Sequence, residues 1–390
     1  MSLLPSGQIA FSSILPDGDV GLLNLPSAAP PSWEMSCSHT ECTLHQISPY
    51  IGKLKSSIAG DLVEKYSVTG DLVVDPFAGS ATIPLEAALR KRRVFASDVS
   101  PYSRVLSNAK LSPPDSLQNA LLQIEETLRL ARKLRSPDLR HTPRWVRKFF
   151  HPKTLKEAIN FATACRESGN EFLLACLLGI LHHQRPGFLS YPSSHLVPYL
   201  RDRAYPRAKF PQMYSYRELR PRMIAKVARV FARYSSPRVS SAIAYQQAAI
   251  QQVELPTSFD CLITSPPYMN ALDYGRDNRL RLWFIDPESG PPVESGVTRH
   301  ARAFVDAICC LASKVQQGLK RGGHCVLVVG ESVKRSFQAH PSSVVLQIMS
   351  ERTKSLRLRE LICDDIPDVR RTRGDVKGVK TEHFLVFQKA

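Results

Sequence analysis

Asp71-Leu-Val-Val-Asp-Pro-Phe-Ala-Gly-Ser-Ala-Thr82, followed by Val94-Phe-Ala-Ser-Asp98, is the stretch that predicts the fold. The apolar run at its start is typical of a buried parallel strand. The apolar residues between Ser80 and Arg92 suit a helix, and the second segment reads as a short strand that ends in an acid. A strand, a helix and a strand in this order predict a βαβ unit, in which helices cover the faces of a sheet.

The same alternation returns late in the chain, after a long helical interruption. The late pattern predicts a turn at Gly322-Gly323, helices at 300–320 and 340–353, and strands at 259–264, 324–329, 356–363 and 383–388. The interruption shows helical patterns at 116–134, 153–167, 170–183 and 217–234. A stretch rich in Pro, Tyr and Arg, predicted to be loop, occupies 185–216. We therefore predict an irregular N-terminal arm (1–34), one α/β domain (35–112 and 241–390) and a mainly helical insertion (113–240).

Positive charge is concentrated in the insertion. The 390 residues contain 52 Lys and Arg against 35 Asp and Glu, a net charge of +17. Between Leu111 and Ser240 the net charge is +14, which leaves only +3 for the rest of the chain. Such a basic segment favours a polyanionic partner, with nucleic acid first and an anionic membrane surface second. The alternative is a solvated face with no partner.

Several classes of protein are disfavoured by the composition. Hydrophobic residues make up 43% of the chain, enough for a sizeable core. The longest apolar run, Phe172 to Leu181, is shorter than the ~20 residues of a membrane span and predicts a buried helix. No secretory signal is visible at the N-terminus. Nine cysteines without framework spacing favour reduced thiols, so we expect a cytoplasmic protein without a membrane partner.

The loop after the first strand has the features of a nucleoside-binding turn. Gly79 allows close approach of the backbone to a ligand, and the following helix offers free N–H groups at its N-terminus. Asp98, at the end of the next strand, is placed to bind ribose hydroxyls. An ordinary βα turn is the alternative, because Asp-Pro-x-x-Gly alone is a weak signal.

A second loop, Thr264-Ser-Pro-Pro-Tyr268, also follows a predicted strand. Its two prolines fix the backbone and remove N–H donors, which leaves a rigid loop with outward carbonyls. The Ser265 hydroxyl and the Pro266 carbonyl could accept hydrogen bonds from an amino group on a flat base, while the Tyr268 ring stacks on that base. A proline turn with a packed tyrosine is the alternative.

Together, the two loops resemble those of the methyltransferases that modify exocyclic amino groups of DNA bases. The first loop is similar to that family's S-adenosylmethionine loop, and Ser-Pro-Pro-Tyr resembles the catalytic loop favoured by N4-cytosine enzymes. His45-Gln-Ile-Ser-Pro-Tyr-Ile-Gly-Lys53 and Asn270-Ala-Leu-Asp-Tyr-Gly-Arg276 are similar to the flanking segments.

In two places the chain departs from the pattern of that family. Ala81 replaces a glycine, a change expected to leave the turn intact, and Tyr245 to Ala249 lacks the Gly-Asp that contacts adenine, for which Gln247 is a candidate.

The resemblance implies a Rossmann-like class I methyltransferase sheet, S-adenosylmethionine as cofactor and no metal. It implies that the catalytic residues are Ser265, Pro266, Pro267 and Tyr268. The implied cofactor-binding residues are Tyr50, Lys53, Asp75, Pro76, Phe77, Ala78, Gly79, Ser80 and Asp98. A zinc knuckle at Cys37, Cys42 and His45 is disfavoured, since zinc sites usually use two separated pairs of ligands.

By the same resemblance, the insertion is where one permuted class carries its target recognition domain. Cations interleaved with aromatic residues are candidates for phosphate and base contacts in double-stranded DNA. These candidates are Arg144, Arg147, Lys148, Arg201, Arg203, Arg207 and Arg276. The alternative is that the aromatic residues pack a small core while the cations face solvent.

The sequence therefore predicts a site-specific DNA methyltransferase that acts on N4 of cytosine in a flipped-out base. Adenine N6 in DNA, a base in RNA, and a DNA-binding protein without turnover are the alternatives. The intact set of Ser265, Pro266, Tyr268 and Asp75 argues against the last of these. A cognate restriction enzyme is a candidate partner. Neither the recognition sequence nor the oligomeric state follows from the sequence.

Overall fold

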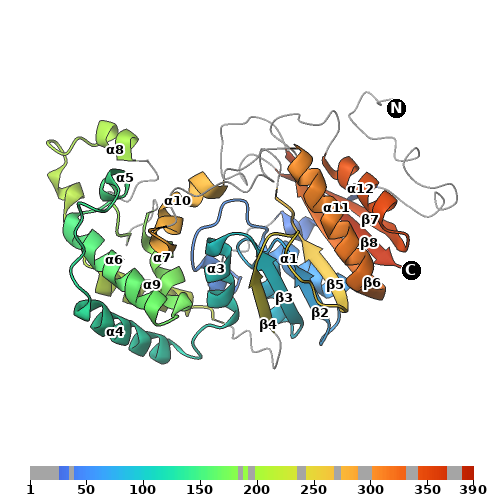
Figure 1. Ribbon diagram of the computed structural model, residues 1–390, viewed down its shortest axis with the longest axis horizontal. Helices are drawn as coiled ribbons and strands as arrows, with labels where there is room; N and C mark the ends of the chain where they lie inside the picture. The colour runs from blue at the N-terminus through green and yellow to red at the C-terminus, as the bar shows by residue number, and fades with distance from the viewer. Residues whose placement is uncertain are drawn as a thin grey trace.

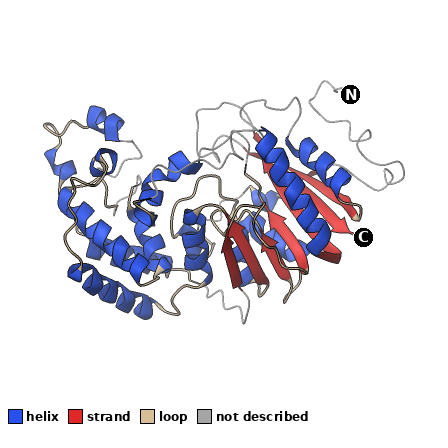
Figure 2. Ribbon diagram, in the orientation of Figure 1, coloured by secondary structure: helices blue, strands red, loops and turns tan. Residues whose placement is uncertain are grey.

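A sheet with helices on its faces and a separate group of helices make up the molecule (Figures 1 and 2). The computed structural model describes residues 26–34, 39–182, 188–191, 198–234, 243–267, 274–288, 301–330, 341–366 and 380–390. The strands of the described part are β1 (Ser27–Ala28), β2 (Leu72–Asp75), β3 (Arg93–Asp98), β4 (Ile243–Gln247), β5 (Phe259–Thr264), β6 (Leu319–Gly330), β7 (Leu356–Ile366) and β8 (Lys380–Lys389).

The sheet has the order β1-β7-β8-β6-β5-β2-β3-β4. All neighbouring strands pair in parallel except at β8, which runs antiparallel to both β6 and β7. This mostly parallel, doubly wound sheet confirms the predicted Rossmann-like α/β fold.

Alternate residues of each central strand enter different cores on the two faces of the sheet. Val73 packs with α1 (Ser56–Tyr66) and α2 (Thr82–Leu89), whereas Val74 packs with α11 (Ala301–Gly318) and α12 (Pro341–Arg352). Burial on both faces explains why β2, β5 and β6 contain continuous apolar runs rather than a polar and apolar alternation.

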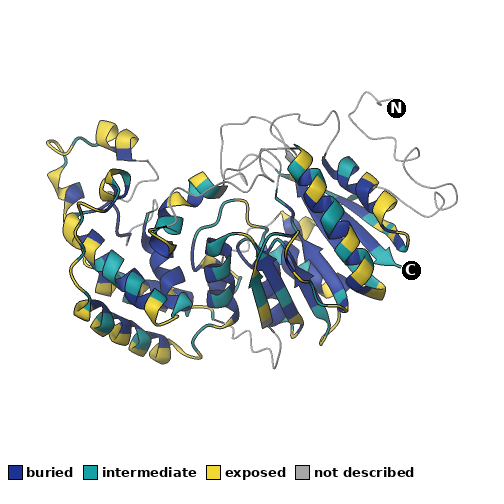
Figure 3. Cartoon of the chain, viewed as in Figure 1, coloured by how far each residue is buried: buried dark blue, intermediate teal, exposed yellow. Residues whose placement is uncertain are grey.

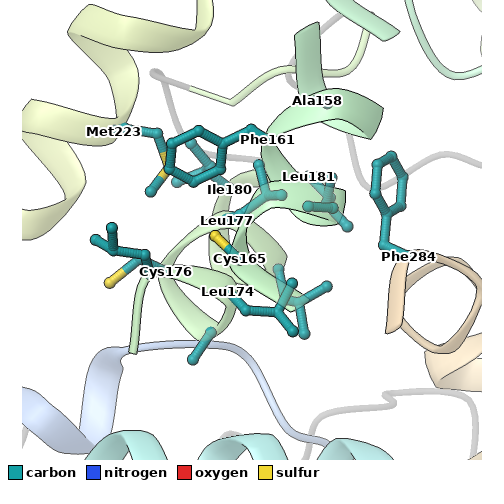
Figure 4. Close-up of a cluster of buried hydrophobic side chains, with 14 of the residues drawn as sticks. Ala158, Phe161, Cys165, Leu174, Cys176, Leu177, Ile180, Leu181, Met223 and Phe284 are labelled. Carbon is teal, nitrogen blue, oxygen red and sulfur yellow. The ribbon is translucent and has the colours of Figure 1, made fainter. Parts of the chain in front are cut away.

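The remaining helices lie beside the sheet. They are α3 (Pro101–Leu111), α4 (Leu117–Lys133), α5 (Arg144–Arg147), α6 (Pro152–Glu167), α7 (Glu171–Ile180), α8 (Pro198–Ala204), α9 (Leu219–Val230) and α10 (Tyr274–Ile285). All of them except α8 contribute to a third core. Helix α7 lies at the centre and is buried from Phe172 to Ile180, as predicted for that apolar run (Figure 3). Phe161 from α6, Met223 from α9 and Phe284 from α10 pack around it, and Leu177 of α7 lies among them (Figure 4). This core also includes residues of α3 and α10, so the division into a domain and an insertion stays a prediction.

Two expectations from the sequence were wrong in detail. The stretch predicted to be loop contains α8 and the 3-10 helix η4 (Pro211–Tyr214), and the buried Arg201 side chain anchors α8. The predicted turn at Gly322-Gly323 lies inside β6, where the pairing with β5 shifts and Gly322 has φ +75°.

The described end of the N-terminal arm is ordered against the sheet. It forms β1 and the 3-10 helix η2 (Pro31–Trp33), and the indole of Trp33 donates to Asp61 at 2.7 Å. The 3-10 helix η3 (Thr43–Gln46) follows. No helix of the described residues is both long and apolar enough to cross a membrane.

Gly179 should be the most demanding position at the junction between α7 and η3. A Cβ atom there would lie 2.2 Å from the Ile47 carbonyl oxygen, which is backbone and has little freedom to move. We expect Gly179→Ala to lower the free energy of unfolding by roughly 1–3 kcal/mol, although alanine is the better helix former. Urea unfolding followed by circular dichroism measures this change.

Gly60→Ala in α1 is the matched control. Its added Cβ would meet only the end of the flexible Arg90 side chain. We expect a change between zero and a gain of about 1 kcal/mol, the helix-propensity difference. Equal effects of the two substitutions would contradict the close packing of α7 on η3.

Candidate functional site

The carboxyl ends of four neighbouring parallel strands meet at one edge of the sheet. Asp75 ends β2, Asp98 ends β3, Gln247 ends β4 and Thr264 ends β5. From β2 the chain proceeds outward to β3 and β4, then returns to β5 on the other side of β2. The gap between β2 and β5 is therefore the topological switch point, where ligands bind in open α/β sheets.

A cavity of about 840 Å³ lies at this edge. Residues of both predicted loops line it together, as do residues of the insertion helix α6 and the end of α10. The predicted site residues in its wall are Tyr50, Lys53, Asp75, Phe77, Ala78, Gly79, Ser80, Asp98, Ser265 and Pro267. Pro76 and Pro266 are buried and do not line the cavity. Tyr268 lies outside the described residues.

A buried hydrogen bond joins the two loops across the switch point. The Thr264 hydroxyl donates to Asp75 Oδ1 at 2.6 Å, and the Phe77 N–H donates to the same oxygen at 3.2 Å. The Asp75 side chain is only 2% exposed, and this burial raises its pKa to about 7. The nearby carboxylate of Asp98 adds to the rise.

Two backbone N–H groups hold the Asp98 carboxylate. Gly79 donates to Oδ2 at 2.9 Å and Ser100 donates to Oδ1 at 2.8 Å. Burial raises the pKa of Asp98, while these hydrogen bonds oppose that rise. Gly79 adopts φ +49°, a left-handed conformation that suits glycine, and its Cα faces the Tyr50 ring. A carboxylate fixed beside the cavity is the group expected to bind ribose hydroxyls.

A buried lysine lies beneath the first loop. Lys110 is 1% exposed, and its ammonium donates to the Ser80 carbonyl. Burial and, to a smaller extent, the charge of Lys53 lower its pKa to about 7. Ala81 lies in the left-handed region at the start of α2 with φ 56°, so the turn forms although alanine stands where the family has glycine.

The segment before the first loop completes this wall. Tyr50 stacks on Tyr102 with 5.7 Å between ring centroids, and Lys53 Nζ donates to the His45 carbonyl at 3.1 Å. The His45 ring is buried against Glu86 at 2.5 Å. Among the described residues no cluster of metal-binding side chains occurs, and Cys37 lies outside them.

The second loop places a hydroxyl at the cavity wall. Ser265 Oγ donates to the Val328 carbonyl at 3.4 Å, so its oxygen can act as an acceptor toward a ligand. Residues 270–273 of the flanking segment lie outside the described part, whereas Arg276 is exposed on α10.

Several wall residues were missed by the sequence reasoning. Val99 is 49% exposed, an apolar surface directly after Asp98. Arg104 comes from the first turns of α3 and Arg166 from the end of α6. Only Val99 gave a local signal, because it follows the acid at the end of β3. The two arginines reach the cavity through helix packing, which no motif records.

The cations predicted to contact DNA fall into two groups. Arg144, Arg147 and Lys148 are exposed, while neighbouring aromatic side chains pack in the core, among them the buried Phe149 and Phe150. Helix α5, which carries Arg144 and Arg147, contacts α10, where the Arg279 guanidinium lies 4.8 Å from the Trp145 ring centroid.

The prediction for Arg201 needs correction, because this side chain is buried. It is 3% exposed, and its guanidinium donates to the Lys148 carbonyl at 2.9 Å and to Asp202 at 2.7 Å. It anchors α8 rather than facing a partner. Arg203 is exposed, and the exposed Arg207 stacks its guanidinium 4.9 Å from the Tyr214 ring centroid.

Comparison with known families supports a methyltransferase. Residues 50–136 match the model of the D12 class N6 adenine-specific DNA methyltransferases. The match includes the first loop and Asp98 but ends before Ser265. It bears out the predicted DNA methyltransferase domain and its cofactor, S-adenosylmethionine, but not the N4-cytosine subtype. No curated protein sequence matches significantly.

Solved structures give distant matches. TrmN from Thermus thermophilus matches with 12% identity and a TM-score of 0.34, covering 87% of this chain and 50% of its own. This chain thus spans half the length of that protein. A SAM-dependent methyltransferase from Methanosarcina mazei matches with 8% identity and a TM-score of 0.36, covering 84% and 96%. A TehB-like SAM-dependent methyltransferase from Corynebacterium glutamicum matches with 8% identity and a TM-score of 0.32, covering 85% and 87%.

Removal of the Asp75 charge should stabilise the protein at alkaline pH. The Asp75 carboxyl loses its proton near pH 3.8 in the unfolded chain and near pH 7 in the folded protein. The free energy of unfolding therefore decreases as the pH rises from about 3.8 to about 7. This difference in pKa corresponds to roughly 4 kcal/mol as an upper bound. We expect Asp75→Asn to be more stable than the natural protein at pH 8, with a gain that shrinks toward pH 4. Urea unfolding at both pH values measures it.

Asp260→Asn provides a control of opposite sign. Burial raises the pKa of Asp260, but the Leu72 N–H and the Lys320 ammonium lower it to a net decrease. Its charge therefore contributes stability above the unfolded pKa, and this contribution is lost as the pH falls. The Asn variant should be less stable at pH 8. If both variants shifted in the same direction, the buried charge of Asp75 would not be the cause.

Proposed function

We propose that this protein transfers a methyl group from S-adenosylmethionine to N4 of cytosine in double-stranded DNA. The observation that carries the proposal is the shared cavity at the switch point, which the Asp75 loop and Ser265 both line. A nucleoside-binding half and a base-binding half in one cavity are what a transfer between cofactor and base requires. The cavity volume falls in the range of ligand sites, 300–1,000 Å³.

The wall residues fit S-adenosylmethionine by their chemistry. The fixed Asp98 carboxylate would bind the ribose, the exposed Val99 would pack on the adenine, and Gly79 would let the backbone approach. Lys53 supplies a positive charge for the cofactor's carboxylate. When bound, the cofactor supplies an electrophilic methyl group on a sulfonium.

The second loop would prepare the base nitrogen for attack. The lone pair of an exocyclic amine is conjugated with the ring and therefore a poor nucleophile. A hydrogen bond from the NH₂ to Ser265 Oγ, which lines the cavity, would favour a pyramidal nitrogen with an available lone pair. The carbonyl of the buried Pro266 is the second acceptor that the resemblance implies. The cofactor would supply the methyl group and leave as a neutral thioether, while Ser265 would hold the amine in place and the methylated nitrogen would release its proton to solvent. Positioning is required more than a strong base.

Access to the base requires that it leave the duplex. Flipping a base out costs a few kcal/mol, which stacking on an aromatic ring offsets in part. Tyr268 is the proposed stacking partner, by its resemblance to the family's loop. The exposed cations of α5 and Arg203 and Arg207 are the proposed phosphate contacts.

Adenine N6 is the second candidate target, favoured by the family model that matches residues 50–136. In this proposal those residues form the cofactor half of the site, whereas the target base would contact Ser265 and the insertion. The Ser-Pro-Pro form of the second loop therefore supports cytosine, and the family match supports adenine. An RNA base, or DNA binding without turnover, would also use a basic insertion.

Ser265→Ala should reduce methylation by at least 10²-fold, because the hydroxyl acts directly at the amino group. Mass spectrometry of nucleosides from DNA and RNA of cells expressing each variant measures it. N4-methylcytosine in DNA is the expected product, and N6-methyladenine would correct the base. Ser313→Ala, an exposed serine of α11, is the matched control and should keep full activity. A modified nucleoside only in RNA would contradict the DNA assignment.

Neutralising the exposed cations of α5 should weaken DNA binding without affecting the fold. We expect Arg144→Gln with Arg147→Gln to reduce the magnitude of the slope of log K against log salt by about two, one for each lost phosphate contact. Fluorescence anisotropy with duplex DNA, at salt concentrations from about 50 to about 200 mM, measures this slope.

The control changes two exposed cations at the opposite edge of the insertion. Arg132 and Lys133 end α4, which lies far from α5 in Figure 1. Their replacement by Gln should leave the slope nearly unchanged. An equal loss in both double variants would indicate a general charge effect rather than a DNA-binding face at α5.

A further inference from the structure

Four polar side chains form a hydrogen-bonded chain between α7 and the nucleoside end of the cavity. Arg104 on α3 donates from Nε to Gln247 Oε1 at 3.0 Å, and its Nη1 pairs with Glu171, the first residue of α7. Asn108, one turn along α3, also donates to Glu171. The Arg104 guanidinium is thus held from the insertion side while it contacts the last residue of β4.

The chemistry of arginine determines which way the Gln247 amide faces. A guanidinium has only donors, so the oxygen of the amide must face Arg104 and its NH₂ must face elsewhere. Gln247 and Arg104 both line the cavity, together with Asp98 and Val99. Gln247 pairs in register with Asp98 on the neighbouring strand, so the two side chains end side by side, about 5 Å apart along the sheet.

A cofactor adenine bound in this cavity would end near Gln247, which lines it beside Asp98 and Val99. If Asp98 holds the ribose and Val99 packs on the base, the edge of the ring lies toward β4 and α3. A carboxylate here, as in the family's Gly-Asp, would accept from the adenine amino group. At Gln247 the amide oxygen already accepts from Arg104, so the NH₂ of the amide is the group left to face the ligand. An NH₂ group donates, and a ring nitrogen of adenine is an acceptor that it can bind.

We propose that Arg104, held by Glu171 of the insertion, is a positioning residue that turns the NH₂ of Gln247 toward a ring nitrogen of the cofactor's adenine. This inference rests on the proposed cofactor and adds how this chain recognises the base of that cofactor. It also makes the recognition depend on α7, because the side chain that orients Gln247 is fixed at the first turn of that helix.

Calorimetric binding of S-adenosylhomocysteine and its 1-deaza, 3-deaza and 7-deaza analogues tests the proposal without catalysis. Each analogue replaces one ring nitrogen by C–H and removes one acceptor. The natural protein should bind one of the three about tenfold more weakly than the parent compound, the loss expected for a single hydrogen bond. Equal affinities for all four compounds would overturn the proposal.

Two variants separate the donor from the residue that orients it. Gln247→Glu keeps a partner for Arg104 but has no NH₂, so it should bind the four compounds equally. Arg104→Met leaves the amide free to turn, so the ratio of affinities should fall from about tenfold toward about threefold. A purely structural role of Arg104 would weaken all four alike and leave the ratio unchanged, which would overturn the positioning role.

The outcomes also separate this inference from the proposed function. Binding of S-adenosylhomocysteine with no methylated nucleoside in cells would reject the target and leave the adenine contact standing. Failure of S-adenosylhomocysteine itself to bind would reject the cofactor assignment of the cavity, and the adenine contact with it.

Discussion

One buried hydrogen bond, from the Thr264 hydroxyl to the Asp75 carboxylate, constrains the whole site. The two residues are 189 positions apart, yet their strands are neighbours at the switch point of the sheet. A carboxylate buried this deeply is costly unless donors surround it, and Thr264 and the Phe77 N–H are the donors that the structure shows. The alignment of β2 and β5 therefore decides whether the two loops face one cavity.

The segment between α3 and β4, the predicted insertion, must leave and re-enter the sheet without disturbing that alignment. It leaves through α3 and returns at β4, next to β3, so the interruption lies at the outer edge of the sheet and not between β2 and β5. Its core is continuous with α3 and α10, and α10 follows the second loop. A shift of the insertion would thus reach the cavity from two sides, through Arg104 on α3 and through the end of α10.

Features set by adjacent residues could be predicted from the sequence, and features set by distant contacts could not. A short apolar run predicts a strand, and the acid or the Ser-Pro-Pro loop that follows it marks the residue at the end of that strand. Asp75, Asp98 and Ser265 could therefore be predicted as site residues. The burial of Arg201 could not, because it depends on the Lys148 carbonyl 53 residues away. The same holds for Lys110, whose helical position gives no sign that its ammonium lies under Ser80. Helix α8 was missed because its composition suggests a loop, and the anchored Arg201 overrides that weak propensity.

The two halves of the cavity come from different parts of the chain, and this explains why the family match supports the cofactor but not the identity of the target base. In the proposed scheme most of the cofactor half comes from residues 50–104, inside the segment 50–136 that a family model matches, and Gln247 joins it from β4. The target half combines the second loop, α10 and the insertion, which are far apart in the chain. Base preference then depends on how these distant parts pack around a flipped base. A Ser-Pro-Pro loop and a segment that matches an adenine-type family are compatible in one chain, because in the proposed scheme different walls of the cavity would bind the two ligands.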